Sequence, residues 1–365
     1  MPLQPRPEIN NIIAGTHGGP DFSEIKSSGV SFDRILDFSV CCNPYPPPAT
    51  VRKSLRSLKI NLYPDSQCCE LRSKLSQKLG ISTANILAGN GTTELIRLIA
   101  LAYFNKGDRV LLPGPTYGEY EIASRIAGAE IINCPLEWRE SRTAALKNLG
   151  EAILKYYPKA VFLCNPNNPT GQYFSREEIE IIISNLKDTL LILDEAYINF
   201  VDEAWPSIPL MNRGNIIILR SMTKDYGLAG LRLGYALAGV NVINNLRRVC
   251  PPWNVNCAAQ QAGLAVLDTE DFLKQSQKRI RQSKQFLIKE LSRIGLTPLP
   301  SQTNFFLIKV GSGKSFRLAL LRHGILVRDC SSFGLPEYIR IAPRTLTDCR
   351  KLIEVIKRLQ QEGEL

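Results

Sequence analysis

The sequence of 365 residues has only two histidines, His17 and His323, and none of its ten cysteines are spaced as Cys-x-x-Cys. Zinc centres need several such ligands at short spacing, so the sequence predicts no metal site. Two cysteine pairs are adjacent, Cys41-Cys42 and Cys68-Cys69. We expect the cysteines to stay reduced and to pack as small apolar side chains.

The sequence also lacks a long apolar stretch. No run reaches the roughly 18 residues that a membrane-spanning helix needs. The first ten residues contain three prolines and no apolar core of the kind found in secretory signals. We therefore expect a cytoplasmic protein with no membrane partner.

Acidic residues are fewer than basic ones, 34 against 45, which gives a formal net charge of +11. The basic residues are scattered along helical segments such as 274–289, and no basic tract alternates with aromatic residues. This distribution favours a solvated basic surface and no nucleic-acid partner. Apolar residues at 44% and charged residues at 22% are ordinary for a globular protein, and the length is sufficient for two domains.

Between residues 86 and 238, apolar runs of strand length alternate with segments of helical periodicity. This alternation predicts an α/β fold with a mostly parallel central sheet that helices cover on both faces. The predicted strands are 86–89, 109–112, 130–133, 160–164, 190–193, 215–219 and 233–238.

The pattern changes after Pro251-Pro252-Trp253. Two helices, at 256–267 and 269–294, precede a smaller α+β unit. Its predicted strands and helices are 303–310, 314–323, 325–328, 338–341 and 347–361. We predict a large domain over residues 50–255 and a small domain over residues 1–49 and 256–365.

Polar or glycine-containing motifs follow five of the predicted strands. They are 90–93, 113–117, 165–171, 194–197 and 221–224. Chemistry in parallel sheets gathers at the carboxyl ends of the strands, so we expect these five motifs to surround one site.

Lys224 belongs to the last of these motifs, within a glycine-punctuated stretch that ends at Tyr235. It is either a solvated surface lysine or an amine held in a pocket beside an anion, and Ser221, Thr223 and Arg232 would gather on that anion. Thr92 and Thr93 begin a helix whose free backbone N–H groups also suit a phosphate, although such residues are equally common as plain helix caps.

Asp194 ends an apolar run, so its carboxylate is expected to be buried and to need a cationic partner. A protonated pyridine nitrogen would satisfy it, and Tyr197 lies close enough to reach an oxygen on the same ring. The alternative is a structural aspartate that accepts hydrogen bonds from backbone N–H groups.

The segment 311–315, Gly-Ser-Gly-Lys-Ser, is similar to a nucleotide-binding loop. That loop needs a glycine at position 308, where this chain has isoleucine. We therefore predict a turn followed by a helix cap.

This set of motifs resembles that of the pyridoxal-phosphate enzymes of the class I and II aminotransferase family, which share fold type I. The motifs occur in the family's order along nearly the whole chain. They are Ala88–Glu94, Pro113–Tyr117, Asn165–Gly171, Asp194–Tyr197, Ser221–Arg232 and Tyr338–Arg340.

The resemblance implies that Lys224 carries the cofactor as a Schiff base and moves protons, while Asp194 pairs with the pyridine nitrogen. It implies that Tyr63 reaches the phosphate from a partner subunit, and therefore a homodimer. The other residues implied for the cofactor are Gly91, Thr92, Thr93, Tyr117, Asn168, Tyr197, Ser221, Thr223 and Arg232.

Within the family the chain resembles threonine-phosphate decarboxylase and histidinol-phosphate aminotransferase. The decarboxylase pattern is matched at 17–19, where an N-terminal His-Gly-Gly segment would lie over the site, at 37–44 and at 328–335. Both resemblances imply a small phosphorylated substrate, and Arg340 would bind a substrate carboxylate. The candidates for the substrate phosphate are His17, Gly18, Asn43 and Arg328.

The sequence favours decarboxylation of L-threonine O-3-phosphate, with histidinol-phosphate transamination as the alternative. Asp225 matches neither enzyme, and Ala229-Gly230 is closer to the transaminase. A regulator or nucleic-acid-binding protein on this fold is a third hypothesis. It is disfavoured because no helix-turn-helix module is attached and the lysine motif is present.

Overall fold

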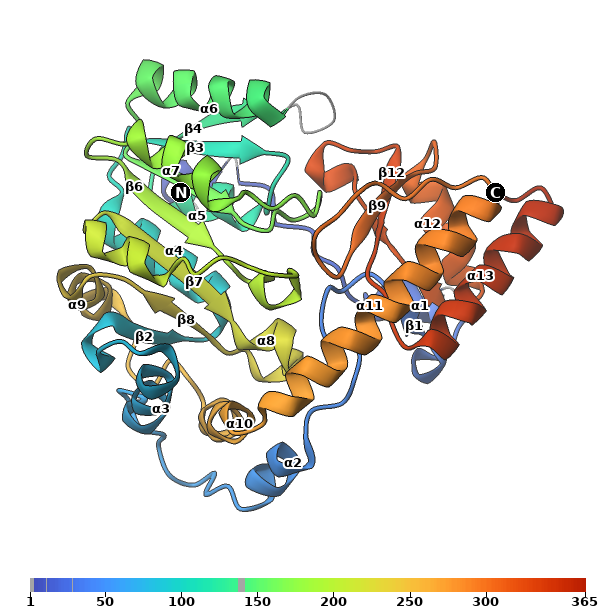
Figure 1. Cartoon of the computed structure of the whole chain (residues 1–365), viewed down its shortest axis with the longest axis horizontal. Helices are drawn as coiled ribbons and strands as arrows, with labels where there is room; N and C mark the ends of the chain where they lie inside the picture. The colour runs from blue at the N-terminus through green and yellow to red at the C-terminus, as the bar shows by residue number, and fades with distance from the viewer. Residues whose placement is uncertain (1–2, 11, 28, 137–141) are drawn as a thin grey trace.

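A computed structural model describes residues 3–10, 12–27, 29–136 and 142–365 (Figure 1). Its largest element is a seven-stranded sheet in which only β8 runs antiparallel to its neighbours. In spatial order the strands are β2 (Ile86–Gly89), β8 (Gly234–Leu237), β7 (Ile216–Ser221), β6 (Leu190–Asp194), β5 (Ala160–Cys164), β3 (Arg109–Gly114) and β4 (Glu130–Pro135). The predicted α/β fold with a mostly parallel sheet is confirmed.

Helices cover both faces of this sheet, as the predicted alternation requires. One face packs against α4 (Gly91–Tyr103), α5 (Glu119–Ile126) and α9 (Val240–Val249). The other packs against α2 (Ala49–Arg56), α3 (Cys69–Leu79), α6 (Arg142–Tyr156), α7 (Arg176–Ser184) and α10 (Cys257–Leu267). Successive side chains of β7 point to opposite faces of the sheet. Ile216 and Ile218 pack in one hydrophobic core, and Ile217 and Leu219 pack in the other.

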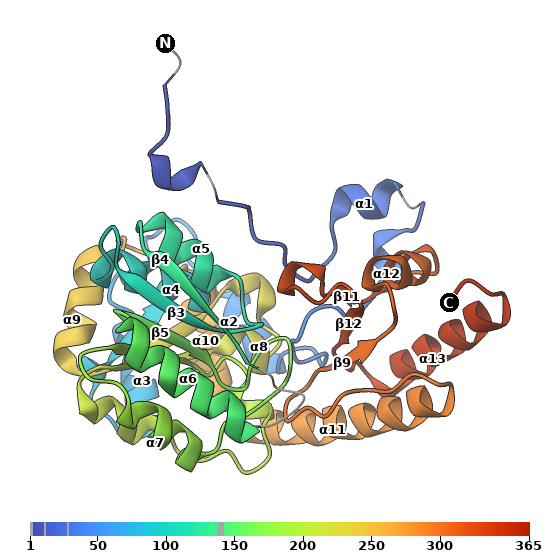
Figure 2. The same ribbon diagram turned by 90° about the horizontal axis from the view of Figure 1, so that it is seen from above.

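A second, smaller unit lies beside the large sheet (Figures 1 and 2). It contains a three-stranded antiparallel sheet and a two-stranded parallel one. Its elements are α1 (Phe22–Ser27), β1 (Leu36–Asp37), α11 (Glu270–Arg293), β9 (Phe306–Lys309), α12 (Gly313–Arg322), β10 (Ile325–Leu326), β11 (Arg328–Asp329), β12 (Tyr338–Ile341) and α13 (Leu346–Gln361). The strand predicted at 325–328 is therefore two short strands, which pair with different partners.

The helix α10 lies in a different unit from the one that the sequence predicted. It packs with α2 and α3 in the core of the large sheet, whereas the sequence placed residues 256–267 in the small unit. We therefore propose that the C-terminal part of the small unit begins with α11, which runs from α10 across to the small sheets (Figure 1).

Local signals set several helix starts. Ser175 begins α7 with a complete capping box, in which its hydroxyl accepts from the Glu178 N–H and the Glu178 carboxylate accepts from the Ser175 N–H. The glycine-rich segment at 311–315 is a turn followed by the cap of α12, because Ser312 Oγ accepts a hydrogen bond from the Ser315 N–H. The sequence predicted both features.

Short 3-10 helices occupy several connections. They are η1 (Pro7–Ile9), η2 (Phe32–Arg34), η3 (Thr83–Asn85), η4 (Ile198–Phe200), η5 (Ile208–Arg213), η6 (Ala229–Leu231) and η7 (Ser331–Phe333). The short helix η1 lies against α5 of the large unit, and residues 12–21 lead to α1 in the small unit (Figure 2). Within the described residues, none of the helices has the length and apolarity to cross a bilayer.

Candidate active site

The five predicted motifs meet at the carboxyl edge of the large sheet, where a cavity of about 60 Å³ adjoins one of about 1180 Å³. Every residue predicted for the cofactor lines the smaller cavity, apart from Gly91 and Tyr63. Its lining residues are Thr92, Thr93, Tyr117, Tyr120, Cys164, Asn168, Asp194, Ala196, Tyr197, Ser221, Thr223, Lys224 and Arg232.

Asp194 lies at the floor of this cavity, at the end of β6, and is 2% exposed. Its carboxylate accepts hydrogen bonds from the Tyr120 hydroxyl at 2.8 Å and from the Ala196 N–H at 3.0 Å. Burial raises the pKa of Asp194 to about 6, against the effect of these two bonds. A cationic partner would therefore stabilise its ionised form.

Tyr120 is a site residue that the sequence did not single out. It is fully buried in α5, stacks on Phe162 with ring centroids 4.9 Å apart, and orients Asp194 through its hydroxyl. The available signal was spacing, because Tyr120 follows Tyr117 by three residues at the start of a helix, which places both on one face. The two rings meet edge to face at 5.5 Å.

The other end of the small cavity collects hydrogen-bond donors. Arg232, in the left-handed region with φ 58°, has no carboxylate within ion-pair distance in the described residues. A Cβ on Gly91 would lie 2.7 Å from Arg232 Nη2, so only glycine lets the guanidinium approach the start of α4. Thr92 begins the same helix, where free N–H groups suit an anion.

Two hydroxyl groups at this end of the smaller cavity differ in their hydrogen bonding. Thr223 is hydrogen-bonded to the backbone of Leu233, at 3.2 Å to its oxygen and 3.3 Å to its nitrogen, and so holds the segment that carries Arg232. Ser221 makes no side-chain hydrogen bond to the described part of the chain, so its hydroxyl is free to bind a ligand.

Lys224 extends from the short helix α8 (Met222–Asp225) into both cavities. Its Nζ lies 3.8 Å from Cys42 Sγ and 5.9 Å from the centroid of the Tyr197 ring. Lys224 and Asp194 therefore line one cavity although they lie on different strand ends. The predicted alternative of a solvated surface lysine does not describe this geometry.

The larger cavity contains two buried arginines that are opposite one another in register, Arg328 on β11 and Arg340 on β12. Arg340 donates to Asn168 Oδ1 and, at 2.7 Å, to the Ser39 carbonyl, while its buried Nε has no partner in the described chain. The pKa of Arg328 is lowered, first by burial and then by the positive charge of Arg340. An anion bound beside both would relieve this repulsion.

The N-terminal segment forms one wall of the larger cavity through residues 12–18. Arg328 donates to the carbonyl of Thr16 at 2.6 Å and to that of His17 at 3.2 Å. A Cβ on Gly18 would lie 2.6 Å from the Ser39 carbonyl, so glycine is required for this close approach. His17, Gly18, Arg328 and Arg340 thus line the cavity in which the sequence placed the substrate.

Glu119 fixes the position of His17 and was not identified from the sequence. His17 Nε2 lies 3.0 Å from Glu119 Oε1, and Arg97 Nη2 lies 3.3 Å from Glu119 Oε2. Glu119 is almost completely buried at the start of α5, whereas His17 is half exposed. The contact joins residues 102 positions apart, so no local pattern indicates it.

Asn43 lies elsewhere than its predicted role requires. It is buried, lines neither cavity, and donates both amide hydrogens within the protein, to the Asp225 carbonyl and to Ser276 Oγ, each at 2.8 Å. Its backbone N–H donates to the Lys224 carbonyl at 2.8 Å. This arrangement favours support of the α8 backbone over contact with a substrate phosphate.

Tyr63 is 80% exposed and stacks on Trp253 at 4.4 Å, away from the cavity of its own chain. Ile60 and Leu62 beside it are also exposed. Tyr63 therefore lines neither cavity of its own chain.

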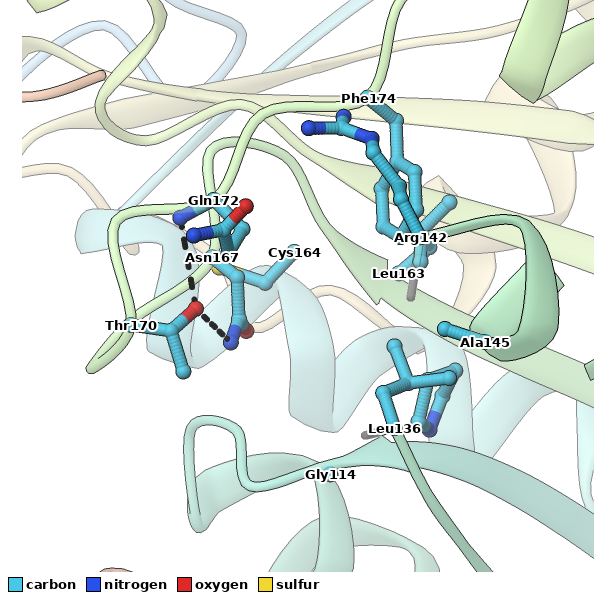
Figure 3. Close-up of a pocket in the computed structure, with 11 residues that line it drawn as sticks. Gly114, Leu136, Arg142, Ala145, Leu163, Cys164, Asn167, Thr170, Gln172 and Phe174 are labelled. Carbon is cyan, nitrogen blue, oxygen red and sulfur yellow. Dashed lines mark hydrogen bonds between the residues drawn. The ribbon is translucent and has the colours of Figure 1, made fainter. Parts of the chain in front are cut away.

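A third, mostly apolar pocket lies behind the loop that follows β5 (Figure 3). Thr170 bonds to Asn167 and Gln172 on one side, and Arg142 covers the Phe174 ring on the other. Its volume is about 40 Å³, and none of the residues predicted for the cofactor or the substrate lines it. It supports the loop that carries Asn168 and is not a substrate site.

The family model named "Aminotransferase class I and II" matches residues 34–356, which include the smaller cavity and all of the larger one except its wall at residues 12–18. The chain belongs to this family. The resemblance found in the motifs is therefore confirmed, together with fold type I and the family's cofactor, pyridoxal phosphate.

Two histidinol-phosphate aminotransferases are similar along most of the chain. That of Thermoanaerobacter pseudethanolicus is 39% identical over 85% of this chain and 87% of its own. The crystal structure of that of Sinorhizobium meliloti, in complex with pyridoxal-5'-phosphate, matches with a TM-score of 0.87 and 27% identity, covering 97% of this chain and 98% of that chain. L-threonine-O-3-phosphate decarboxylase from Porphyromonas gingivalis matches with a TM-score of 0.79 and 28% identity, covering 89% and 99%.

The residues of the smaller cavity fit pyridoxal phosphate. Asp194 is a buried acceptor that needs a cation, as a protonated ring nitrogen provides. At the opposite end, Arg232, Ser221 and the start of α4 supply positive charge and donors without a carboxylate partner in the described chain, as a phosphate requires. Lys224 lies on the same cavity, so it would hold the cofactor covalently.

We expect Arg232→Ala to weaken cofactor binding about ten- to hundredfold, because one charge-assisted hydrogen bond to phosphate contributes about 1.5–3 kcal/mol. Equilibrium dialysis of pyridoxal phosphate against the cofactor-free protein measures this. Arg213→Ala is the control, since Arg213 pairs with Glu180 on the surface. Equal Kd values for the two variants would contradict the assigned role of Arg232.

Proposed function

We propose that this protein transfers the amino group of histidinol phosphate to a 2-oxo acid such as 2-oxoglutarate. The observation that carries the proposal is 39% identity to a histidinol-phosphate aminotransferase across 85% of the chain, combined with a cavity that holds both Lys224 and two buried arginines.

This proposal replaces the sequence-based preference for decarboxylation. That preference depended on the motifs at 17–19, 37–44 and 328–335. His17, Gly18 and Arg328, from two of these motifs, line the larger cavity together. These residues suit a substrate phosphate, and both candidate substrates carry one. They therefore cannot distinguish the two reactions, whereas overall similarity favours the aminotransferase.

When bound, pyridoxal phosphate supplies an electron sink for the bonds to the substrate Cα. Asp194 would hold the proton on the ring nitrogen, and Tyr120 keeps the Asp194 carboxylate in place. Lys224 would hold the cofactor, and its Nζ would be the group that takes up and returns the proton of the substrate Cα.

The two arginines would orient both substrates in turn. Arg328 and Arg340 converge on one cavity without a carboxylate within ion-pair distance in the described residues. We propose that they bind the phosphate of histidinol phosphate in one half-reaction and a carboxylate of the oxo acid in the other. The wall formed by residues 12–18 would limit the access of water.

An assay of the purified holoenzyme tests this function. We expect glutamate to form only when histidinol phosphate and 2-oxoglutarate are both present. Release of CO2 from L-threonine O-3-phosphate without any glutamate formation would instead establish decarboxylation. The His-Gly-Gly segment over the cavity is the observation that keeps that second reaction in the test.

We also propose a homodimer in which Tyr63 completes the site of the partner subunit. A hybrid dimer of one Lys224→Ala subunit and one Tyr63→Ala subunit then contains one intact site and one doubly defective site. We expect the hybrid to be clearly more active than either variant homodimer.

Separately tagged subunits, co-expressed and purified through both tags, provide the hybrid for this measurement. If Tyr63 served its own chain, each hybrid site would carry one defect and no activity would be recovered. The exposure of Tyr63 and its position away from its own cavity support the first outcome.

A further inference from the structure

A further cavity in the large unit is lined by two arginines and lies apart from the active site. Its volume is about 230 Å³, and it shares no lining residue with either active-site cavity. Arg72 comes to it from α3 and Arg247 from α9, and residues 87 and 88 of the edge strand β2 complete one side. We call it the arginine cavity.

The two guanidinium groups are held against one turn of the chain. Arg72 Nη2 donates to the Thr83 carbonyl at 2.6 Å, and Arg247 Nη2 donates to the Ile86 carbonyl at 3.3 Å. These carbonyls belong to the two ends of η3, where the Ile86 N–H itself donates to the Thr83 oxygen. The fold therefore brings two positive charges from different helices to the same place.

These two charges are not balanced within the chain. The hydrogen bonds of both guanidinium groups go to backbone carbonyls, and neither group has a carboxylate within ion-pair distance in the described residues. Arg72 Nε is buried and has no hydrogen-bond partner in the same part of the chain. The pKa of Arg247 is lowered, first by burial and then by the positive charge of Arg72. Such an arrangement is costly unless an anion offsets it.

Two acidic residues lie next to lining residues of the arginine cavity, but neither lines it. Asp65 precedes the lining segment 66–68, and its carboxylate accepts hydrogen bonds from two backbone N–H groups of its own loop. Glu94 accepts from the Asn90 N–H and from Asn254 Nδ2, each at 2.7 Å. Both carboxylates are thus bonded to other groups, and the space between the arginines is left for a ligand.

We propose that the arginine cavity binds a phosphate-type oxyanion between Arg72 and Arg247, either inorganic phosphate or the phosphate group of a small metabolite. Guanidinium groups carry their N–H donors in a planar fork that fits the oxygens of phosphate, and two of them suit a doubly charged anion. The unused Nε of Arg72 provides one donor. This site is separate from the active site, so the inference does not depend on the proposed function.

Thermal unfolding of the holoenzyme in rising concentrations of inorganic phosphate tests the proposal, with chloride at equal ionic strength as the reference. A ligand that binds only the folded state raises Tm. Arg328→Gln serves as the parent protein, because it removes an arginine that could bind phosphate at the active site. We expect phosphate to raise its Tm. The double variant Arg247→Gln, Arg328→Gln should need about ten- to hundredfold more phosphate for the same rise, since a charge-assisted hydrogen bond is lost.

A purely structural role of Arg247 predicts a different result. The double variant would then have a lower Tm without phosphate but an equal rise with phosphate, and this outcome would overturn the proposal. Glycerol phosphate in place of inorganic phosphate distinguishes the two sources of the anion. A rise with both identifies a site for the phosphate group of a larger molecule, a rise with inorganic phosphate alone identifies a site for the free ion, and no rise with either refutes the site.

A measurement on the wild-type holoenzyme gives an answer even if the Arg247 variant does not fold. Cys250 lines the arginine cavity, whereas Cys257 is also half-buried and lies outside it. We expect phosphate to slow the alkylation of Cys250 by iodoacetamide relative to that of Cys257, as followed by peptide mass spectrometry. An unchanged ratio of the two rates would contradict the proposal.

An acidic side chain of a second copy of the chain is the other anion that could fill this cavity. In that case Arg247→Gln would weaken the dimer in sedimentation velocity, and phosphate would change neither Tm nor the alkylation of Cys250. That combination would overturn the proposal of a small-molecule site.

Discussion

Replacement of Lys224 by alanine is expected to lower kcat at least about 10³-fold, because the variant loses both the covalent hold on the cofactor and the group that moves the Cα proton. Lys224 is the only lysine that lines either of the two cavities in the described chain. The measurement is glutamate production by the variant, together with borohydride reduction and mass spectrometry to detect covalently attached cofactor.

Lys309→Ala is the matched control, because Lys309 pairs with Glu337 on the surface of the small unit. It should retain wild-type activity and cofactor attachment. Full turnover by Lys224→Ala, or cofactor attached to another lysine in wild type, would refute the assignment of this site.

Replacement of Asp194 by asparagine is expected to reduce kcat about 10²–10³-fold, the usual cost of removing one preorganised electrostatic stabiliser. Asparagine keeps the shape of the side chain and can still bond to Tyr120 and Ala196, so geometry is preserved and charge is lost. Asp268→Asn, an exposed carboxylate paired with Lys74, serves as the control.

In the cofactor-free protein, Asp194→Asn should increase the free energy of unfolding, although it lowers kcat. Burial raises the pKa of Asp194 to about 6, from 3.8. The folded state therefore holds this proton more tightly than the unfolded chain, and the cost of ionisation grows from pH 4 to pH 6 and is constant above. At pH 8, Asp194→Asn should unfold with a free energy up to about 2–3 kcal/mol larger than wild type.

Urea unfolding at pH 4 and pH 8 measures this difference, which should nearly vanish at the lower pH. A variant that loses activity but gains stability identifies Asp194 as a functional charge. Lower stability at pH 8 would show that the carboxylate serves the fold instead.

Much of the fold follows from local patterns in the sequence. The strands of the large sheet are short apolar runs, and parallel strands buried on both faces need no alternation to be recognised. The pairing of strands in the small unit was harder to predict. Val327 separates two-residue strands that pair in different sheets, so the apolar run at 325–328 gave no sign of the break.

The cofactor side of the site was also largely predictable. Asp194 ends β6, and Lys224 and Thr92 lie three residues after the ends of β7 and β2. Strands that run in the same direction bring such residues to one edge of the sheet. The sequence did not identify two residues that hold other site residues in place. Tyr120 and Glu119 are ordinary helix residues until the fold places Asp194 and His17 against them.

The sequence by itself therefore determined the family, the sheet and the lysine–aspartate pair, because these depend on motifs within a few residues of a strand end. Tertiary structure decided the rest. It placed Asn43 outside both cavities, brought Arg328 opposite Arg340, and buried Asp225 without a full set of hydrogen-bond partners in the described chain. These features are contacts between distant segments, and their energies depend on burial, which only the folded chain defines.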